Sequence, residues 1–449
     1  MIFFVVVLVA ILTWIVPGGE YQRIEKEGRT IVVPNSFQFK SANPQGLGDV
    51  LMSPVRGFVE AAKIISFLFV IGGAFMIITG TGAITAGLQK LALFFQRKPH
   101  LQIYLIPVTM TIFSLGGAVF GMSEETLPFV LIFIPLALSL GYDSIVGTAI
   151  PFLGAAAGFA GALFNPFTIG IAQSIAEIRL YSGLEYRIVV WIISTISAVS
   201  FVMWYAAKIK KNPQSSIVYE IDQKRTYNKI DENTEFTWNH KAVLILFLLS
   251  MVFLVVGILQ FHWYITEIAA LFLGLGIVSG FVGKMHINTM ADSFKEGAKD
   301  MMGVALIIGT ARGILVIAEN GMILDSFLYA IAEQISHFHP VIASQAMFVS
   351  HGIINFFIHS GSGQAALTMP IMAPLADLVG VSRQTAVLAF QFGDGWINPI
   401  LPTSGVTMGV LGLAQIPYEK WFKWMLPLQV YYFILALVLL IPPFFINYV

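Results

Sequence analysis

Two stretches of this chain repeat one series of polar and proline residues inside long apolar sequence. The first copy contains Ser123-Glu124-Glu125-Thr126, then Pro135-Leu136-Ala137, then Asn165-Pro166-Phe167-Thr168. The second contains Ser362-Gly363-Gln364-Ala365, then Pro374-Leu375-Ala376, then Asn398-Pro399 with Thr403-Ser404. Helix-breaking segments are tolerated at membrane depth only where they line protein or a water-filled cavity. Such segments at matching places in two apolar halves indicate the binding site of a secondary transporter.

The composition places the chain in lipid. It is 57% hydrophobic and 11% charged, with a mean hydropathy of +0.80, whereas soluble domains carry about 25% charged residues. The formal net charge of +0 gives no indication of a nucleic-acid partner. The chain has no cysteine, which excludes disulfides, thiolate nucleophiles and thiolate metal sites. We therefore expect an all-α polytopic membrane protein.

Apolar runs and their flanking charges divide the chain into four regions. These are residues 1–56 (a first span and a polar outer loop with a short strand at Arg29–Val33), 57–211 (a first repeat), 212–240 (a linker) and 241–449 (a second repeat). The N-terminal apolar run resembles a signal-peptide core but lacks a basic lead-in and a small-residue cleavage site, so a span is favoured. Lys208, Lys210 and Lys211 place the linker on the cytoplasmic side.

Each repeat is predicted to contain a helical hairpin and a broken helix. The interval 101–141 is cut at Gly116-Gly117 and at Ser123–Thr126, so it forms either two full spans or a re-entrant hairpin. The hairpin is favoured, because adjacent carboxylates in apolar sequence are costly unless they face protein, water or a ligand. The corresponding outer hairpin is 341–381. The broken helices are 144–178 and 384–412, since proline disfavours helix at the residue before it.

The predicted crossings give the two repeats opposite orientations. Re-entrant hairpins do not cross, and the second half has one crossing more than the first, which reverses the second unit. Arg97-Lys98, Lys284, Lys420 and Lys423 then fall on the cytoplasmic side with the lysines of 208–211, as the positive-inside rule requires. The prediction is an inverted-topology repeat with one hairpin entering from each side.

Glu124 and Glu125 are the candidate groups that bind a cation. Neighbouring residues cannot share a helical face, so one would face the pore and the other would cap a helix N-terminus. Acids inside a membrane are functional by default, and we expect at least one of them to bind a substrate ammonium or guanidinium group, or a coupling proton. The alternative is a structural cap beside a buried neutral acid.

The helix breaks supply the other candidate ligands. Broken helices expose backbone groups that coordinate Na⁺ or hold a carboxylate, so substrate contacts are expected from the breaks and from the inner tip (Asn165, Thr168, Asn398, Pro399, Thr403, Ser404, Ser123, Thr126). Hydroxyl and amide oxygens suit hard cations. A coupling Na⁺ would use Ser123, Asn165, Ser362 and Asn398; a coupling H⁺ is the alternative, and no other cofactor is expected. Asn-Pro could also simply cap a kink.

The outer tip and two isolated charges complete the candidate site. Ser360, Gly361, Ser362, Gly363 and Gln364 are small and polar, which fits a close backbone approach to substrate or a plain turn. Asp394 either completes a cation site or caps a half-helix. Arg312, inside a span, either binds a substrate carboxylate or neutralises Glu124, Glu125 or Glu319, since buried charges are normally paired. His359 is either a proton carrier or a hydrogen-bonded structural histidine.

With these motifs in hand, the chain resembles the bacterial four-carbon dicarboxylate anaerobic carrier family of the ion-transporter superfamily, and within it the branch named for basic-amino-acid antiport. The resemblance covers essentially the whole chain and rests on residues 121–126, 165–168, 359–364 and 398–405. It implies a homodimer of scaffold and transport domains in the bacterial cytoplasmic membrane, working by an elevator motion. Sodium-coupled dicarboxylate members carry Ser-Asn-Thr at both tips, whereas this chain has Glu124-Glu125 and Gly363-Gln364.

The sequence therefore predicts a secondary transporter of amino-acid-sized ions, with arginine- or ornithine-type antiport as the first hypothesis. Two carboxylates beside the site attract a cationic amino acid and repel a dianion. The alternative is a dicarboxylate or peptide carrier of the same fold, coupled to Na⁺ or H⁺. An enzyme is not expected, because no nucleophile–base spacing is present. A channel would not need two hairpins.

Overall fold

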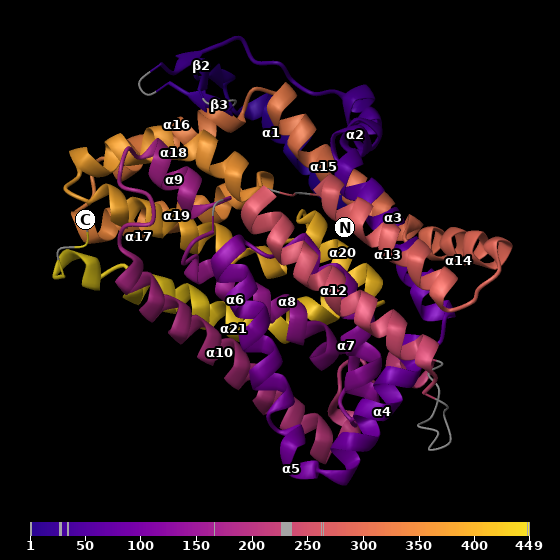
Figure 1. Cartoon of the computed structure of the whole chain (residues 1–449). Helices are drawn as coiled ribbons and strands as arrows, with labels where there is room; N and C mark the ends of the chain where they lie inside the picture. Colours follow the sequence, from indigo (N-terminus) through magenta and orange to yellow (C-terminus); the bar gives the residue numbers. More distant parts are fainter. Residues whose placement is uncertain are drawn as a thin grey trace.

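The structure of the chain is a computed structural model that describes residues 2–26, 29–33, 36–165, 167–225, 236–261, 263, 265–446 and 448. Pro166 of the first predicted break and residues 226–235 of the predicted linker lie outside this set. Figure 1 shows a mostly helical protein with two small two-stranded sheets at one end.

The N-terminal region combines a short helix with the strands of the predicted outer loop. Its elements are α1 (Ile2–Ile15), β1 (Gly19–Glu20), β2 (Arg23–Lys26), β3 (Arg29–Val32) and β4 (Gln38–Phe39). β1 pairs with β4, and β2 pairs with β3, both antiparallel. The strand predicted at Arg29–Val33 is thus present. α1 has 14 residues, fewer than the roughly 20 that a straight span needs.

The remaining helices of the first half follow the predicted order. They are α2 (Leu47–Glu60), α3 (Ala62–Gly80), α4 (Ala83–Arg97), α5 (Pro99–Gln102), α6 (Leu105–Phe120), η1 (Glu124–Thr126), α7 (Leu127–Ser139), α8 (Ser144–Gly161), α9 (Ile169–Ile175) and α10 (Leu184–Lys211). The linker begins with η2 (Pro213–Ser215) and α11 (Tyr219–Gln223).

The second half of the chain contains the remaining helices. Its elements are α12 (Trp238–Phe261), α13 (Ile265–Val282), α14 (Ile287–Asp300), α15 (Met302–Asn320), α16 (Leu324–Ile335), α17 (Pro340–Phe357), α18 (Gly361–Leu378), α19 (Arg383–Gly395), η3 (Asn398–Ile400), α20 (Gly405–Leu413), α21 (Tyr418–Leu439) and η4 (Pro442–Phe444). The intervals of the two predicted hairpins each form two helices joined by a tip, and both predicted broken helices are interrupted.

The two halves repeat the same run of helices. α2 and α14 each have 14 residues, and α3 and α15 each have 19. A hairpin, a capped broken helix and a long final helix follow in both halves. Each hairpin ends at a glycine with a positive φ, Gly141 or Gly380. A side-chain cap then starts the broken helix: Asp143 accepts from the amide of Val146, and Ser382 accepts from the amide of Thr385.

Seven helices in the described part of the chain are long and apolar enough to cross a bilayer, or eight if the bent pair α14–α15 is one span. Five fall where full spans or the first broken helix were predicted (α3, α8, α10, α13, α21). The other two are His100–Phe120 and Pro340–Phe357, the first arms of the predicted hairpins, which are therefore long enough to span by length and composition. The chain is a multi-span membrane protein.

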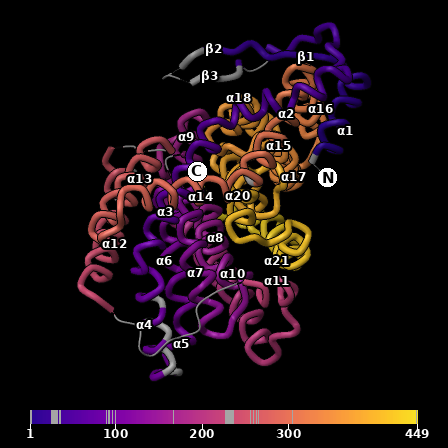
Figure 2. The backbone as a smooth tube through the Cα atoms, turned by 90° about the vertical axis from the view of Figure 1, so that its right-hand side faces the viewer, coloured from indigo at the N-terminus to yellow at the C-terminus, as the bar shows by residue number. Residues whose placement is uncertain are grey.

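The helices pack in two groups. α2, α3, α13, α14 and α15 form the first, in which α2 packs on α15 while α14 packs on α3. The second contains α6–α10 and α17–α21, where α8 and α19 are central. Figure 2 shows α12 and α13 along one side of the molecule and α21 along the other. β1–β3 lie at one end of this view, and α4 and α5 lie at the opposite end.

Close backbone contact fixes the first group. A Cβ placed on Gly297 of α14 would lie 2.2 Å from the carbonyl oxygen of Gly72 in α3. A Cβ on Gly57 of α2 would lie 2.4 Å from the backbone nitrogen of Gly313 in α15. Both distances are below any van der Waals contact, so only glycine permits these approaches. Small residues serve this purpose in membrane helix pairs.

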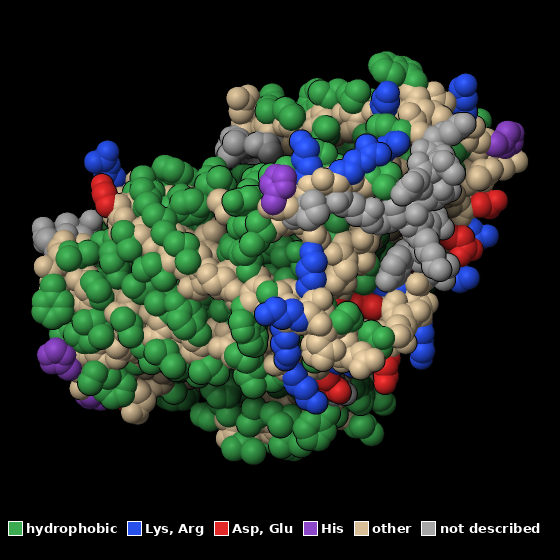
Figure 3. Space-filling model, turned by 90° about the horizontal axis from the view of Figure 1, so that it is seen from below, with side chains coloured by type: hydrophobic (Ala, Val, Ile, Leu, Met, Phe, Trp, Pro, Cys, Tyr) green, Lys and Arg blue, Asp and Glu red, His purple; other side chains and the backbone are tan. Residues whose placement is uncertain are grey.

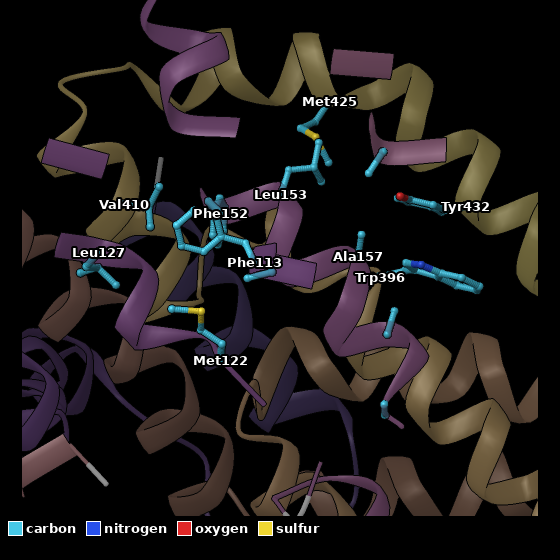
Figure 4. Close-up of a cluster of buried hydrophobic side chains, with 14 of the residues drawn as sticks. Phe113, Met122, Leu127, Phe152, Leu153, Ala157, Trp396, Val410, Met425 and Tyr432 are labelled. Carbon is cyan, nitrogen blue, oxygen red and sulfur yellow. The ribbon is translucent and has the colours of Figure 1, made fainter. Parts of the chain in front are cut away.

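The core of the second group surrounds α8 and α19. Figure 4 shows Phe152, Leu153 and Ala157 among the buried side chains of this region. The rings of Trp396 and Tyr432 stack with centroids 5.2 Å apart, at 10° between their planes. The indole nitrogen of Trp396 donates to Ser194 Oγ (2.9 Å). Trp396 directly follows α19, so this packing holds the start of the second break in place.

Charge at the surface is unequally distributed. Figure 3, which views the molecule from below, shows a band of Lys and Arg side chains beside a broad hydrophobic area. α10 carries Lys208, Lys210 and Lys211 in its last turn, and its lower end lies toward α5 in Figure 1. The predicted cytoplasmic lysines of this helix therefore lie at the end opposite the β-strands.

Candidate functional site

A single cavity of about 520 Å³ lies between the two helix groups and receives residues from both hairpin tips and both breaks. We name residues 121–126 the inner tip and residues 358–362 the outer tip. The cavity lining includes Glu124 and Glu125 of the inner tip, Ser360 of the outer tip, and Asn398 of the second break. Residues from both halves of the chain therefore line one pocket.

The inner tip is a tight turn that exposes two carboxylates to the cavity. α6 is followed by Gly121, whose φ of 74° suits glycine, and a Cβ there would lie 2.5 Å from Asn165 Oδ1. Glu125 Oε2 accepts from the backbone amide of Ser123 (2.8 Å), and Thr126 Oγ1 donates to the Ser123 carbonyl (2.6 Å). Glu125 thus both closes the turn and lines the cavity, whereas the sequence predicted the cap at one glutamate and the pore-facing side chain at the other.

The outer tip is built as the start of a helix. Ser360 is the N-cap of α18, and its hydroxyl oxygen accepts weakly from the amide of Gly363 (3.4 Å). Ser360 and Ser362 share a hydrogen bond between their hydroxyl groups (3.3 Å). The free backbone N–H groups of a helix N-terminus attract anions. The outer tip therefore carries no acid and offers hydrogen-bond donors.

The two breaks lie next to each other because their helices cross at close range. A Cβ on Gly395, at the end of α19, would lie 2.6 Å from the Cα of Ala160 in α8. The first break follows α8 immediately, and its Thr168 lines the cavity. In the second break, Thr407 Oγ1 donates to the carbonyl of Asn398 (2.7 Å). Crossing at a glycine thus brings two interruptions, far apart in sequence, to one place.

Most of the predicted site residues line the cavity, and four do not. Those in the lining are Ser123, Glu124, Glu125, Thr126, Thr168, Arg312, Ser360, Gly361, Ser362, Asn398, Pro399, Thr403 and Ser404. Asn165, Gly363, Gln364 and Asp394 are not part of it.

The four residues outside the main cavity lie behind it or beside it. Asn165 is buried behind the inner tip, and its Oδ1 accepts from the amide of Phe167 (2.9 Å). Gln364 is buried and donates to the carbonyl of His351 (2.8 Å). Gly363 lines a second cavity beneath the N-terminal loop. Asp394 is fully buried behind Gly361 and Asn398.

The wall formed by α2, α3 and α15 adds charges that the sequence did not indicate as site residues. Glu60 and Lys63 line the cavity together with Arg312, whose Nε donates to Glu60 Oε2 (3.2 Å). The sequence named Glu124, Glu125 or Glu319 as the acid that Arg312 neutralises; the direct ion pair is with Glu60, and Arg312 also acts electrostatically on Glu319. Contact between residues this far apart in sequence depends on the packing of α2 on α15, which no local pattern reveals.

Residues of the linker form hydrogen bonds with the start of α8 and with the residue after α20. Asp222 Oδ2 accepts from the amide of Ser144, the first residue of α8 (2.8 Å). Arg225 donates to Asp222 Oδ1 (2.9 Å) and to the carbonyl of Ala414 after α20. Asp143 Oδ2 accepts from Tyr205 and Ser216. Burial raises the pKa of the Asp143 carboxyl, while these hydrogen bonds oppose the rise.

Comparison with known proteins identifies the family. The family model of the C4-dicarboxylate anaerobic carriers, DcuC, matches residues 1–444. The chain belongs to this family. It is therefore a membrane transporter of a bacterial type and not an enzyme.

Curated relatives extend along nearly the whole chain. One from Escherichia coli, named "Putative basic amino acid antiporter YfcC", is 40% identical over 462 residues, which covers 94% of this chain and 91% of that protein. A Haemophilus influenzae protein is 33% identical over 405 residues and covers 89% and 79%. This chain is similar to both proteins.

Two solved transporters share a distant likeness of fold. The YdaH transporter of Alcanivorax borkumensis has a TM-score of 0.42 at 17% identity, covering 98% of this chain and 96% of its own. MtrF of Neisseria gonorrhoeae, described with a class of antimetabolite efflux pumps, has a TM-score of 0.43 at 18% identity and covers 98% and 93%. Neither likeness bears on the substrate of this chain.

Proposed function

We propose that the chain is an antiporter for cationic amino acids of the arginine or ornithine type. The observation that carries this proposal is the distribution of charge across one cavity: Glu124 and Glu125 line it at the inner tip, and hydrogen-bond donors line it at the outer tip. A cationic amino acid has a positive side chain at one end and a carboxylate at the other. The volume of about 520 Å³ lies within the usual range of roughly 300–1,000 Å³ for small-ligand sites.

Arg312 gives the substrate carboxylate a partner. It lies in α15, and it lines both the main cavity and the second cavity, as Ser360 does. A guanidinium group recognises carboxylates with directional hydrogen bonds. A substrate held between Arg312 and the inner-tip glutamates would have both of its charged ends satisfied. The relative named for basic amino acid antiport agrees with this chemistry.

The mechanism we propose is an elevator motion of a transport domain against a scaffold. The scaffold would be the first helix group, which backbone contact between glycines makes rigid. The transport domain would be the second group, which holds both tips and both breaks. The cavity lies between the groups, so sliding one past the other would expose it alternately. The repeated helix order supports an inverted-topology repeat, and the homodimer implied by the family resemblance remains a prediction.

A dicarboxylate is the second candidate substrate. Lys63 and Arg312 both line the cavity, and they offer two cationic partners for two carboxylates. The family model is named for four-carbon dicarboxylates. Against this candidate, Glu60, Glu124 and Glu125 line the same cavity, so a dianion would meet more acids than bases.

Counterflow in proteoliposomes distinguishes the two candidate substrates, a cationic amino acid and a dicarboxylate. Vesicles loaded with arginine should take up labelled arginine, and external ornithine or lysine should compete, whereas succinate should not. Vesicles without protein and vesicles with protein but no internal amino acid are the controls. Succinate counterflow that arginine does not inhibit would establish the second candidate, and no counterflow with any cationic amino acid would contradict the first.

A further inference from the structure

A second cavity adjoins the main one, and Arg312 and Ser360 line both. Its volume of about 570 Å³ lies within the usual range of roughly 300–1,000 Å³ for small-ligand sites. Its other walls are the N-terminal loop, α16 and the first turns of α18. Figure 1 shows these elements at the end of the molecule opposite the predicted cytoplasmic lysines of α10. The second cavity therefore lies between the main cavity and the predicted outer end.

The N-terminal loop forms a fixed wall of this cavity because α16 holds it in place. The amide of Gly19 donates to the carbonyl of Met322 (3.0 Å), and the amide of Tyr21 donates to Asp325 Oδ2 (2.9 Å). Arg23 forms an ion pair with Asp325 Oδ1 (2.8 Å). Asp325 is 4% exposed, so water does not compete strongly for these contacts. The shape of the second cavity is thus set by the fold.

One acid of the second cavity has no ion pair among the described residues. Asp325 is paired with Arg23, and Glu20 is paired with Lys40 (3.2 Å). Glu319 lines the same cavity and takes part in none of the ion pairs found in the described ranges. The carboxylate of Glu319 is therefore the acid of this cavity that a cationic ligand would meet without displacing a protein cation.

Arg312 supplies the opposite charge from the same helix. It precedes Glu319 by seven residues in α15, which is about two turns, so both side chains share one face and lie about 10 Å apart along the axis. Its Nε donates to Glu60 Oε2, the one hydrogen bond that its guanidinium group makes within the described part of the chain. The two terminal nitrogens are left for a ligand. The second cavity thus offers partners for a carboxylate and for a cation at two separate points.

We propose that the second cavity is an outer binding site for cationic amino acids, an inference that rests on the proposed function. The ligand carboxylate binds Arg312, and the cationic side chain binds Glu319. Because Arg312 also lines the main cavity, the carboxylate keeps its partner while the side chain moves from Glu319 to the inner-tip glutamates. The substrate thus turns about Arg312 and is never without a charged contact as it passes from one cavity to the other.

The test uses the absence of cysteine from the chain. Ala366→Cys places one thiol in the lining of the second cavity and outside that of the main cavity. The purified full-length protein in detergent is treated with methyl methanethiosulfonate, a small neutral thiol reagent, and the labelling rate is followed by mass spectrometry. Arginine should slow this labelling at least several-fold and in a saturable way. Labelling that arginine does not slow would overturn the proposal.

A second probe position covers the case in which Ala366→Cys does not fold or does not react. Gly363 also lines only the second of the two cavities, and a Cβ there would lie no closer than 3.4 Å to its neighbours, so Gly363→Cys fits the available space. The same protection by arginine is expected. If the thiols at both positions fail to react in folded protein, the cavity is closed to solutes and the proposal is wrong.

Two further substitutions, each combined with Ala366→Cys, separate the outer site from the main one. Glu125→Gln removes a carboxylate from the main cavity only, so arginine should still slow the labelling. Glu319→Gln should raise the arginine concentration that halves the labelling rate about tenfold or more, because hydrogen bonds between charged groups are the strong ones. Protection lost in Glu125→Gln, or unchanged in Glu319→Gln, would contradict a separate outer site.

The matched controls come from α16, at the same end of the molecule. Glu333 is exposed and lines neither cavity, so Glu333→Gln changes the net charge as Glu319→Gln does and should leave the protection unchanged. Ser336→Cys places a thiol at an exposed position after α16, where arginine should not slow labelling. An equal loss in Glu333→Gln would assign the effect to the overall surface potential, and equal protection at position 336 would assign it to the reagent; either would overturn the proposal.

The outer site and the proposed function can fail separately. If proteoliposomes exchange arginine while arginine protects neither position 366 nor position 363, the antiporter proposal stands and the outer site does not. If arginine protects position 366 in the Glu125→Gln background while no cationic amino acid is exchanged by the wild type, the second cavity binds arginine and the proposed antiport is wrong.

Discussion

The two hairpin tips have the same place in their repeats and opposite chemistry. The inner tip closes with a short 3₁₀ turn and carries Glu124 and Glu125, whereas the outer tip is the uncharged N-terminus of an 18-residue helix, α18. Both line one cavity. Two tips at corresponding places in the two halves of the chain thus present different groups to one cavity, carboxylates at the inner tip and hydrogen-bond donors at the outer tip.

The largest expected effect comes from cross-linking the two helix groups. The cross-link tests whether the group that carries both tips moves relative to the other group. Gly405 of α20 lies close to the opposite group, since a Cβ there would be 3.6 Å from Ile308 Cγ2. The chain has no cysteine, so Gly405→Cys with Ile308→Cys introduces one defined pair. Cross-linking with mercury should stop arginine counterflow, and a thiol should restore it.

The control for this pair is each single variant with the same treatment. Both residues line the cavity, so binding of arginine is measured by thermal shift in each single variant, where it should persist. Full counterflow in a protein shown to be cross-linked would contradict relative motion of the two groups.

Next in size is loss of charge at the inner tip. Glu125→Gln keeps the shape of the side chain and its hydrogen bond to the amide of Ser123, but it removes a carboxylate from the cavity. Losing one partner of a buried charged contact costs about 2–5 kcal/mol, so arginine exchange should fall at least about 30-fold. Yield and melting temperature measured beside uptake separate this effect from misfolding; normal exchange would exclude Glu125 from cation binding.

In α15, on the opposite wall of the cavity, Arg312 is the group to test, with two ligands that differ only in the carboxylate. Arg312→Gln should weaken arginine binding about tenfold or more, because a hydrogen bond to a charged group contributes about 1.5–3 kcal/mol. Agmatine, which is arginine without its carboxylate, should bind wild type and variant alike. Equal losses for both ligands would show that Arg312 acts through its ion pair with Glu60 rather than on substrate.

The smallest expected effect lies at the matched helix caps, Asp143 and Ser382. Burial raises the pKa of Asp143, so the protonated group favours the folded state. Its contribution is fully present below the unfolded pKa of about 3.9 and is lost as the pH rises through the raised value. Wild type should therefore lose stability relative to Asp143→Asn as the pH rises from about 4, which thermal unfolding at several pH values would show. A pH-independent difference would contradict the shift.

The sequence predicted the parts of the site that lie at interruptions of apolar helices. Glu124-Glu125, Asn398-Pro399 and Ser360–Ser362 stand out because each conflicts with a continuous membrane helix, and all of them line the cavity. The hairpins and broken helices were predicted for the same reason. Local patterns of this kind can be read without knowing what packs against them.

What the sequence did not predict depends on packing between distant segments. Glu60 and Lys63 lie in α2 and α3 at positions that no local sequence pattern distinguishes. Only the contact of α2 with α15 brings Glu60 to Arg312. Gln364 and Asn165 look like ligands in sequence, but the fold uses their amide groups to hold the tips from behind.

The glycine seams at Gly57 and Gly297 have a mechanical consequence. Where backbone lies directly on backbone, no side chain can change rotamer to absorb a displacement, so a shift would have to separate two main chains. In the proposed elevator motion, that wall would therefore stay fixed and the helices that carry the tips would move. A compound bound between Ile308 and Gly405 would contact this fixed wall on one side. It should therefore inhibit transport in whichever conformation it binds.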